Sequence, residues 1–188
     1  PMTTAFPKLS PLIEYLDGLE GRADLAVLER LLAEADLTVA DIESACQFGQ
    51  KGYKRNIIKR TAWYELLALC WRSGDCTPIH DHRGVSCAFR VIQGEGTEIR
   101  FERSASGLMC PVQISKMSPG YICAAVDEDI HQVANMQPPG ADLVTVHIYS
   151  PPISQMGTYQ FTSPSVSTTE QYAGAEELRQ YVGSGAGI

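Results

Sequence analysis

The chain has 188 residues, a formal net charge of −7 at pH 7, 44% hydrophobic residues and 20% charged residues. These values are typical of one ordinary globular domain and unlike those of disordered or fibrous chains. The acidic excess argues against nucleic acid and anionic membranes as partners, because both require clustered lysine and arginine. We expect a single domain over residues 1–188, and a monomer by default.

No apolar run is long enough to span a membrane, and the amino-terminal residues lack the charged and apolar pattern of an export signal. The six cysteines form no Cys-x-x-Cys pair, in a chain large enough to fold without disulfides. We therefore expect a cytoplasmic protein with reduced thiols, not associated with a membrane.

Apolar residues recur at helical spacing between about residues 8 and 48. Asp24 and Thr38 precede two of these segments and have the side chains preferred at helix N-termini. Three short helices are expected in this part of the chain.

From Thr61 onward, runs rich in aromatic and β-branched residues alternate with clusters of Gly, Pro, Asp and Ser. This pattern predicts an antiparallel sandwich or small barrel over about residues 60–162. A C-terminal extension over 163–188 is expected to include a helix at 175–182. The predicted strands are 62–71, 86–92, 97–102, 112–117, 121–124, 131–135 and 143–149, with turns at 72–74, 94–96, 104–107, 118–120 and 137–140.

Two of the chain's four histidines, His80 and His82, are separated by one residue. Neighbours of this spacing on an extended segment point to the same face, so both rings can approach one metal ion. Alone, such a pair is equally compatible with exposed loop histidines.

The surrounding residues favour the metal site. They fit the first motif of cupin proteins, G-x5-HxH-x4-E-x6-G, except that Cys87 occupies the glutamate position. A second motif, with a tighter Pro-Gly and a longer gap before the histidine, follows. Together they predict a mainly β fold, the cupin barrel (double-stranded β-helix or jelly roll) with short N-terminal helices, and a metal site of His80, His82 and His131. The remaining motif residues are Gly74, Gly94, Pro119, Gly120 and Asn135.

Three histidines leave the identity of the metal open, because imidazole serves catalytic zinc, copper and nickel as well as iron. A non-catalytic cupin with a structural metal is the rival hypothesis. It would require a closed site with Cys87 as the fourth ligand.

Four further segments resemble cysteine dioxygenases over about residues 53–156: YKRN at 53–56, LCW at 69–71, IHDHRGVSC at 79–87 and HIYSPP at 147–152. The resemblance implies ferrous iron, Fe(2+), held by the three histidines, and a substrate carboxylate bound by Arg55. It also implies that Tyr149 directs its hydroxyl at the reacting ligands, oriented by His147 and Thr145, and that Cys87 can form a thioether with Tyr149.

The residue types agree with these implied roles. Arg55 has the planar set of donors that binds a carboxylate in a bidentate manner. The sequence is equally compatible with an exposed surface arginine in a basic stretch. Tyr149 shares one strand face with His147, but a buried structural tyrosine would do so too. Tyr53 and Trp71 are interpreted as pocket wall, and the other five cysteines receive no role.

Two departures from the animal members bear on the substrate. Met156 stands where those proteins commonly have cysteine, and Ser86 where they commonly have histidine, so the pocket floor and rim are expected to differ. The resemblance implies oxidation of a small carboxylated thiol by O2 to the sulfinate. Retention of Arg55 and Cys87 favours L-cysteine; 3-mercaptopropionate and mercaptosuccinate remain the alternative substrates.

Overall fold

The computed structural model describes residues 5–127, 129–161 and 163–170, so the helix expected at 175–182 lies outside the described residues. The helical elements, with η marking a 3-10 helix, are η1 (Pro7–Leu9), α1 (Ser10–Asp17), α2 (Leu25–Ala35) and η2 (Val39–Ala45). The strands are β1 (Lys54–Arg60), β2 (Glu65–Trp71), β3 (Ile79–His80), β4 (Val85–Gln93), β5 (Gly96–Arg103), β6 (Met109–Met117), β7 (Ile122–Asp127), β8 (Ile130–Ala134), β9 (Leu143–Ser150), β10 (Gln155–Gln160) and β11 (Ser163–Glu170).

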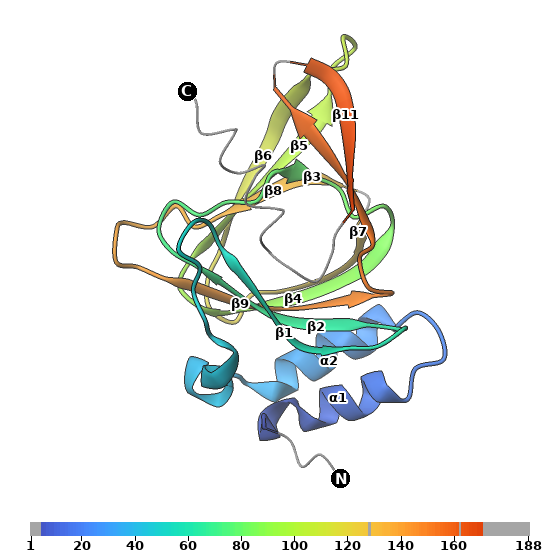
Figure 1. The fold of residues 1–188 in the computed structure, drawn as a ribbon, viewed down its shortest axis with the longest axis vertical. Coiled ribbons are helices and arrows are strands. Elements are labelled where there is room, and N and C mark those ends of the chain that lie inside the picture. The colour runs from blue at the N-terminus through green and yellow to red at the C-terminus, as the bar shows by residue number, and fades with distance from the viewer. Residues whose placement is uncertain (1–4, 128, 162, 171–188) are drawn as a thin grey trace.

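The strands form two antiparallel sheets that enclose a common interior (Figure 1). One sheet has the order β1-β2-β9-β4-β7, and the other has the order β11-β10-β3-β8-β5-β6. The helices α1 and α2 lie against the outer face of the first sheet (Figure 1). The arrangement is the predicted cupin barrel with short N-terminal helices.

Strand β2 is buried along its whole length because both of its faces are covered. Leu66, Ala68 and Cys70 belong to the hydrophobic cluster shared with the helices, whereas Leu67, Leu69 and Trp71 belong to the cluster inside the barrel. The alternation follows from the two-residue period of a strand. It explains why residues 66–71 of β2 form a continuous apolar run.

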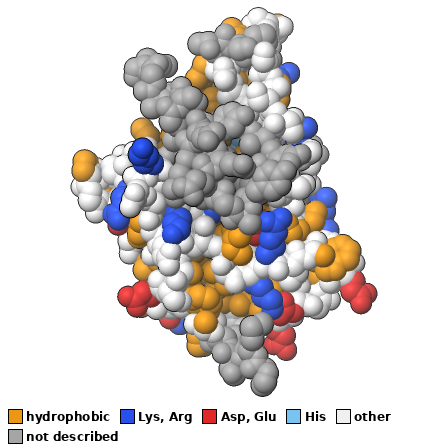
Figure 2. Space-filling view, viewed as in Figure 1, with side chains coloured by type: hydrophobic (Ala, Val, Ile, Leu, Met, Phe, Trp, Pro, Cys, Tyr) orange, Lys and Arg blue, Asp and Glu red, His pale blue; other side chains and the backbone are white. Residues whose placement is uncertain are grey.

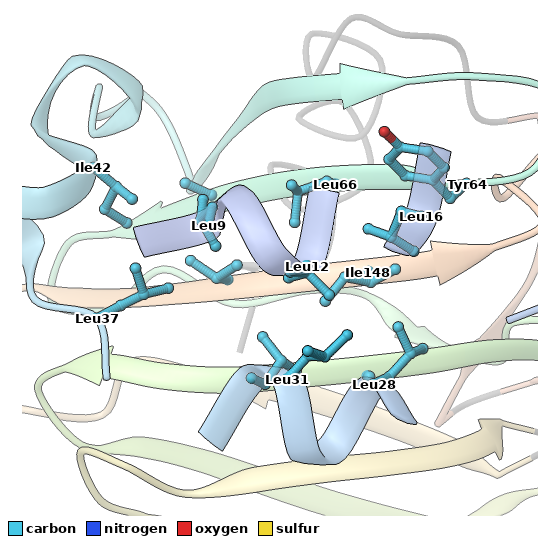
Figure 3. Packing of buried hydrophobic residues seen from close by; sticks show 14 of the residues in the cluster. Leu9, Leu12, Leu16, Leu28, Leu31, Leu37, Ile42, Tyr64, Leu66 and Ile148 are labelled. Carbon is cyan, nitrogen blue, oxygen red and sulfur yellow. The ribbon is translucent and has the colours of Figure 1, made fainter. Parts of the chain in front are cut away.

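The helices contribute leucines to the outer cluster, which Figure 3 shows packed against β2 and β9. Leu12, Leu16 and Leu28 are at most 1% exposed. Burial of a leucine side chain stabilises a fold by about 1.5–3 kcal/mol. The expected N-cap is confirmed at Asp24, whose carboxylate accepts a hydrogen bond from the Val27 amide at 3.0 Å.

At Thr38, the second predicted cap, the Asp41 carboxylate accepts a 2.7 Å hydrogen bond from the Thr38 amide as part of a capping box. The helix that it caps, η2, is of the 3-10 type.

Several strand boundaries differ from the sequence prediction. The β strands begin at Lys54 rather than near residue 60, and residues 61–64 form a turn in which the Thr61 hydroxyl accepts hydrogen bonds from the Trp63 and Tyr64 amides. Strands β3 and β10 were not predicted. Residues 163–170, expected in the C-terminal extension, pair with β10 as strand β11.

The predicted turns each contain a glycine with positive φ. At Gly94, with φ of 79°, a Cβ would lie 2.3 Å from the Asp142 carbonyl oxygen, so only glycine fits. This steric requirement explains the last glycine of the first cupin motif.

Arg90 on β4 connects the barrel to the C-terminus of α2. Its guanidinium donates hydrogen bonds to the carbonyl oxygens of Leu32, at 2.7 Å, and Ala33, at 3.1 Å. These groups would otherwise lack partners at the end of a helix. Replacing Arg90 with methionine should therefore lower the free energy of unfolding by about 1–3 kcal/mol, measured by urea denaturation.

The matched control is Arg30→Met, because the Arg30–Glu34 ion pair lies on the helix surface with both side chains 58% exposed. That change should lower stability by less than about 0.5 kcal/mol. Equal losses for the two variants would contradict the helix-capping role of Arg90.

No helix among the described residues is both long and apolar enough to cross a membrane. On the part of the molecule that Figure 2 shows in colour, basic and acidic side chains are interspersed.

Candidate functional site

A cavity of about 330 Å³ lies inside the barrel. Its wall includes ten of the residues that the sequence analysis assigned to the site: Tyr53, Arg55, Trp71, His80, His82, Cys87, His131, His147, Tyr149 and Met156. These residues come from both sheets and are up to 103 positions apart in the chain. Barrel closure therefore gathers them around one space.

The three predicted metal ligands converge in this cavity. His80 on β3 is the direct strand partner of His131 on β8, and His82 follows two residues after His80. All three side chains are buried, and one ring nitrogen of each lies within 4.8 Å of the others. Among the described residues, the metal-ligating group consists of these three histidines, and Cys87 is not a member.

Neighbouring acceptors determine which nitrogens face the centre. His80 Nδ1 lies 2.8 Å from the Pro78 carbonyl oxygen, and His131 Nδ1 lies 3.0 Å from a Glu98 carboxylate oxygen. Because carbonyl and carboxylate oxygens accept, both Nδ1 atoms carry hydrogen, and in the neutral imidazole each Nε2 then has a lone pair for a metal.

His80 Nε2 is 3.0 Å from His82 Nε2. Two nitrogens that each bind one ion at about 2.1 Å come about 3 Å apart, so the arrangement suits a shared metal. Acceptors behind the ligating histidines are also the usual feature of metal sites. The donor set and its support therefore fit a metal ion held by three imidazoles.

The sequence analysis missed Glu98, whose carboxylate contacts the predicted metal ligand His131. It lies on β5, diagonally across from His131, and the β5–β8 pairing brings the two side chains together. A glutamate among alternating strand residues gives no sequence signal for this role, because its partner lies 33 positions away.

Replacing Glu98 with glutamine should weaken metal binding by about 10–100-fold. Glutamine keeps the size of the side chain but removes the charge that supports the His131 ring. The dissociation constant, measured by competition with a chelator, tests this result. Glu102→Gln, on the same strand but exposed, is the control; equal affinity in both variants would contradict the role of Glu98.

Asp81, between the two histidines of the first motif, anchors that segment to β10. One carboxylate oxygen accepts a 3.1 Å hydrogen bond from the Gly157 amide, and the other accepts the Tyr159 hydroxyl. A Cβ at Gly157 would lie 2.6 Å from the Asp81 carboxylate, so a larger residue at this position would displace that carboxylate. Asp81 thus fixes the position from which His80 and His82 project.

A row of hydrogen-bonding side chains runs along β9, as the spacing predicts. The Thr145 hydroxyl oxygen accepts from the Trp71 indole nitrogen at 3.1 Å and lies 2.8 Å from His147 Nε2. The Tyr149 hydroxyl is 3.3 Å from His147 Nδ1. The row ends beside the metal-ligating group, since the rings of Tyr149 and His82 are in edge contact at 5.4 Å between centroids.

Burial sets the charge state of this row. It lowers the pKa of His147 well below its usual value, and the positive charge of Arg55 acts in the same direction. It raises the pKa of Tyr149 well above its usual value, with a further contribution from Cys87. Near neutral pH, His147 is therefore an uncharged imidazole and Tyr149 an uncharged phenol.

Cys87 and Tyr149 are direct partners on the adjacent strands β4 and β9, and both are buried. Opposite residues of neighbouring strands have side chains on the same face, with Cβ atoms about 4.5–5.5 Å apart. The fold therefore places the thiol and the phenol next to each other on the cavity wall.

Arg55 is buried: its side chain is 9% exposed and its guanidinium carbon lies 5.7 Å from the centre of the Tyr149 ring. The alternative of an ordinary surface arginine is thus wrong. Nearby, the rings of Tyr53 and Trp71 stack with centroids 4.3 Å apart, which agrees with their interpretation as pocket wall.

Of the two positions that the sequence analysis singled out for their effect on the substrate, Met156 lines the cavity and Ser86 does not. Ser86 is fully buried, and its hydroxyl lies 3.5 Å from an Arg22 guanidinium nitrogen of the helical part. The expectation that Ser86 alters the pocket is therefore wrong, because alternation along β4 directs it away from Cys87's side. The sequence analysis also left out Arg100 and Cys123, which do line the cavity.

Comparison with solved structures supports the fold. An uncharacterized conserved protein with a double-stranded β-helix domain from Klebsiella pneumoniae superposes with a TM-score of 0.52 and 14% identity, covering 63% of this chain and 88% of that protein. At this identity the likeness concerns the fold alone.

Sequence comparison identifies the family. Cysteine dioxygenase type 1 from Danio rerio is 29% identical over 119 residues, covering 60% of this chain and 58% of that protein. The Bos taurus protein of that name is 27% identical over 152 residues, covering 69% of this chain and 74% of its own length. The family model for cysteine dioxygenase type I matches residues 12–162, and the chain belongs to the cysteine dioxygenase type I family.

Proposed function

We propose that the protein is a non-haem Fe(2+) thiol dioxygenase that adds both atoms of O2 to a small carboxylated thiol, with L-cysteine as substrate and cysteine sulfinate as product. The observation that carries the proposal is the position of Arg55, which lines the same cavity as the three histidines. One side of that cavity suits a metal, and another suits an anion.

His80, His82 and His131 would hold the iron. Three neutral imidazoles leave the ion its full charge and free coordination positions, where bound ferrous iron would supply a site for the thiolate and O2 together. Going from thiol to sulfinate removes four electrons from sulfur, and O2 accepts four, so no further reductant is required.

Arg55 would bind the substrate carboxylate through its donor fork and so place the sulfur at the metal end of the cavity. The stacked rings of Tyr53 and Trp71 would form the wall beside the carbon chain, and Met156 an apolar part of the floor. These contacts would restrict the orientation of a small thiol.

The Tyr149 hydroxyl would donate a hydrogen bond to the reacting ligands. Its pKa, raised by burial, keeps the proton on the phenol, and His147 and Thr145 fix its direction. A thioether between Cys87 and Tyr149 would form by loss of the thiol hydrogen and one ring hydrogen, with O2 as the oxidant. The link would hold the phenol in place and remove a competing thiol, and a mass lower by two hydrogens would reveal it.

The test is oxygen uptake and product mass with iron-loaded protein and a panel of thiols. L-Cysteine should be consumed with one O2 per thiol and a product heavier by two oxygen atoms. Faster turnover of 3-mercaptopropionate or mercaptosuccinate would reassign the substrate within the same reaction. Absence of uptake with every thiol, together with native zinc content, would refute the dioxygenase and favour a non-catalytic metal-binding cupin.

We also propose that the protein acts as a cytoplasmic monomer. The acidic net charge and the cysteine-containing site support this proposal, because the chemistry requires reduced thiols. Size-exclusion chromatography with light scattering tests the oligomeric state.

A further inference from the structure

A buried carboxylate that the proposed mechanism does not use lies next to Arg55. It belongs to Glu65, the first residue of β2, which is 2% exposed. Glu65 Oε1 is 3.5 Å from Arg55 Nη2, and both side chains are at least nine-tenths buried. A buried ionised pair of this kind is uncommon in a barrel interior and needs a reason.

The strand pairing brings Glu65 to the edge of the site. Glu65 on β2 is the direct partner of Tyr149 on β9, which is in turn the partner of Cys87 on β4. Along β2, Glu65 has the same parity as Leu67 and Leu69, which face the barrel interior. It does not itself line the cavity, so it sits behind Arg55 and can act on a ligand only through charge.

Arg55 is the only cation that forms an ion pair with Glu65 among the described residues, and Glu65 Oε2 has no hydrogen-bond partner among them. The carboxylate is therefore under-solvated, and its charge is balanced by one guanidinium. A guanidinium has five donors, so contact through Nη2 leaves other donors for a second carboxylate. The substrate carboxylate would share Arg55 with a resident negative charge.

We propose that Glu65 is a specificity-determining residue that restricts the Arg55 end of the cavity to thiols with a single carboxylate. This inference rests on the proposed function. With Glu65 ionised, one substrate carboxylate brings the Arg55 end to a net charge of −1. A second carboxylate on the same ligand adds further negative charge beside the buried Glu65 carboxylate, and like charges repel. Cysteine should therefore be preferred over mercaptosuccinate.

The decisive variant is Glu65→Gln, which keeps the size of the side chain and an acceptor for Arg55 but removes the charge. The ratio of kcat/KM for mercaptosuccinate to that for L-cysteine should rise by about tenfold, through KM. Cysteamine, which has no carboxylate, should change by less than about twofold, because no anion then lies at Arg55. Glu102→Gln removes the same charge from an exposed position and should leave all three values unchanged.

An unchanged ratio in Glu65→Gln, or equal losses for all three thiols, would overturn the inference and leave Glu65 with a structural role. Glu65→Asp keeps the charge and should retain the wild-type preference; a tenfold change there would also contradict the proposal. This second variant covers the case in which Glu65→Gln does not fold.

Anaerobic calorimetry on the metal-loaded proteins separates this inference from the reaction itself. The Kd for mercaptosuccinate relative to cysteine should fall by about tenfold in Glu65→Gln. Wild-type protein that binds both thiols with the expected preference but consumes no O2 would refute the dioxygenase and retain the role of Glu65. Wild-type protein that oxidises mercaptosuccinate faster than cysteine would refute the role of Glu65 and retain the dioxygenase.

Discussion

Replacing His131 with alanine is expected to abolish both metal binding and thiol oxidation. His131 is the one ligand contributed by β8, and the other two come from a single short segment around β3. Two imidazoles alone hold a metal loosely and would not confine the thiol and O2 to one side. The metal content should fall below about one tenth per protein, and the oxidation rate below about one thousandth of the wild-type rate.

The matched control is the fourth histidine of the chain, His147. It lies in the same cavity but outside the metal-ligating group of the described residues. His147→Ala should retain stoichiometric metal and lose rate only, because it orients Tyr149. Elemental analysis and oxygen uptake on both variants distinguish the two roles. Stoichiometric metal in His131→Ala would mean that the third ligand has been misassigned.

Replacing Arg55 with lysine should lower kcat/KM for L-cysteine by about 10–100-fold, because an ammonium cannot reproduce the bidentate contact of a guanidinium. Lysine rather than alanine is the informative choice, since it keeps a positive charge beside buried Glu65. Removing that charge would leave an unpaired buried carboxylate and destabilise the fold. Cysteamine turnover should change by less than about threefold.

Arg60→Lys provides the control for Arg55→Lys, because Arg60 lies on the same strand with an exposed side chain. It should leave the kinetics of both thiols at wild-type values. Equal losses for cysteine and cysteamine in Arg55→Lys would remove the proposed carboxylate contact, and an unchanged rate for cysteine would refute it outright.

Local patterns were sufficient for part of this site. The spacing of His80 and His82 requires only the two-residue period of an extended chain, and the row on β9 follows from the same rule. The same rule predicts the orientation of Ser86. Because its neighbour Cys87 faces the barrel interior, the Ser86 side chain must face outward. Ser86 was wrongly assigned to the pocket because the assignment used the resemblance to family members and ignored the alternation with Cys87.

Other elements gave no local signal. Strand β3 is two residues long, and β1 (KRNIIKR) has a basic, weakly alternating sequence, so neither has the pattern of a buried strand. They form because neighbouring strands supply hydrogen-bonding partners: β8 and β10 for β3, and β2 for β1. Tertiary pairing overrides weak local preference in such segments.

The sequence by itself was sufficient for the fold class and for the prediction of three metal ligands and the residues around them, because strand periodicity and motif spacing are local properties. Only the tertiary structure decided which charged side chains contact those residues. Glu98 meets His131, and Glu65 meets Arg55, through the pairing of strands and the burial that follows from barrel closure. The charge of a glutamate can be read from sequence, but its partner and its distance from water depend on where the barrel places it.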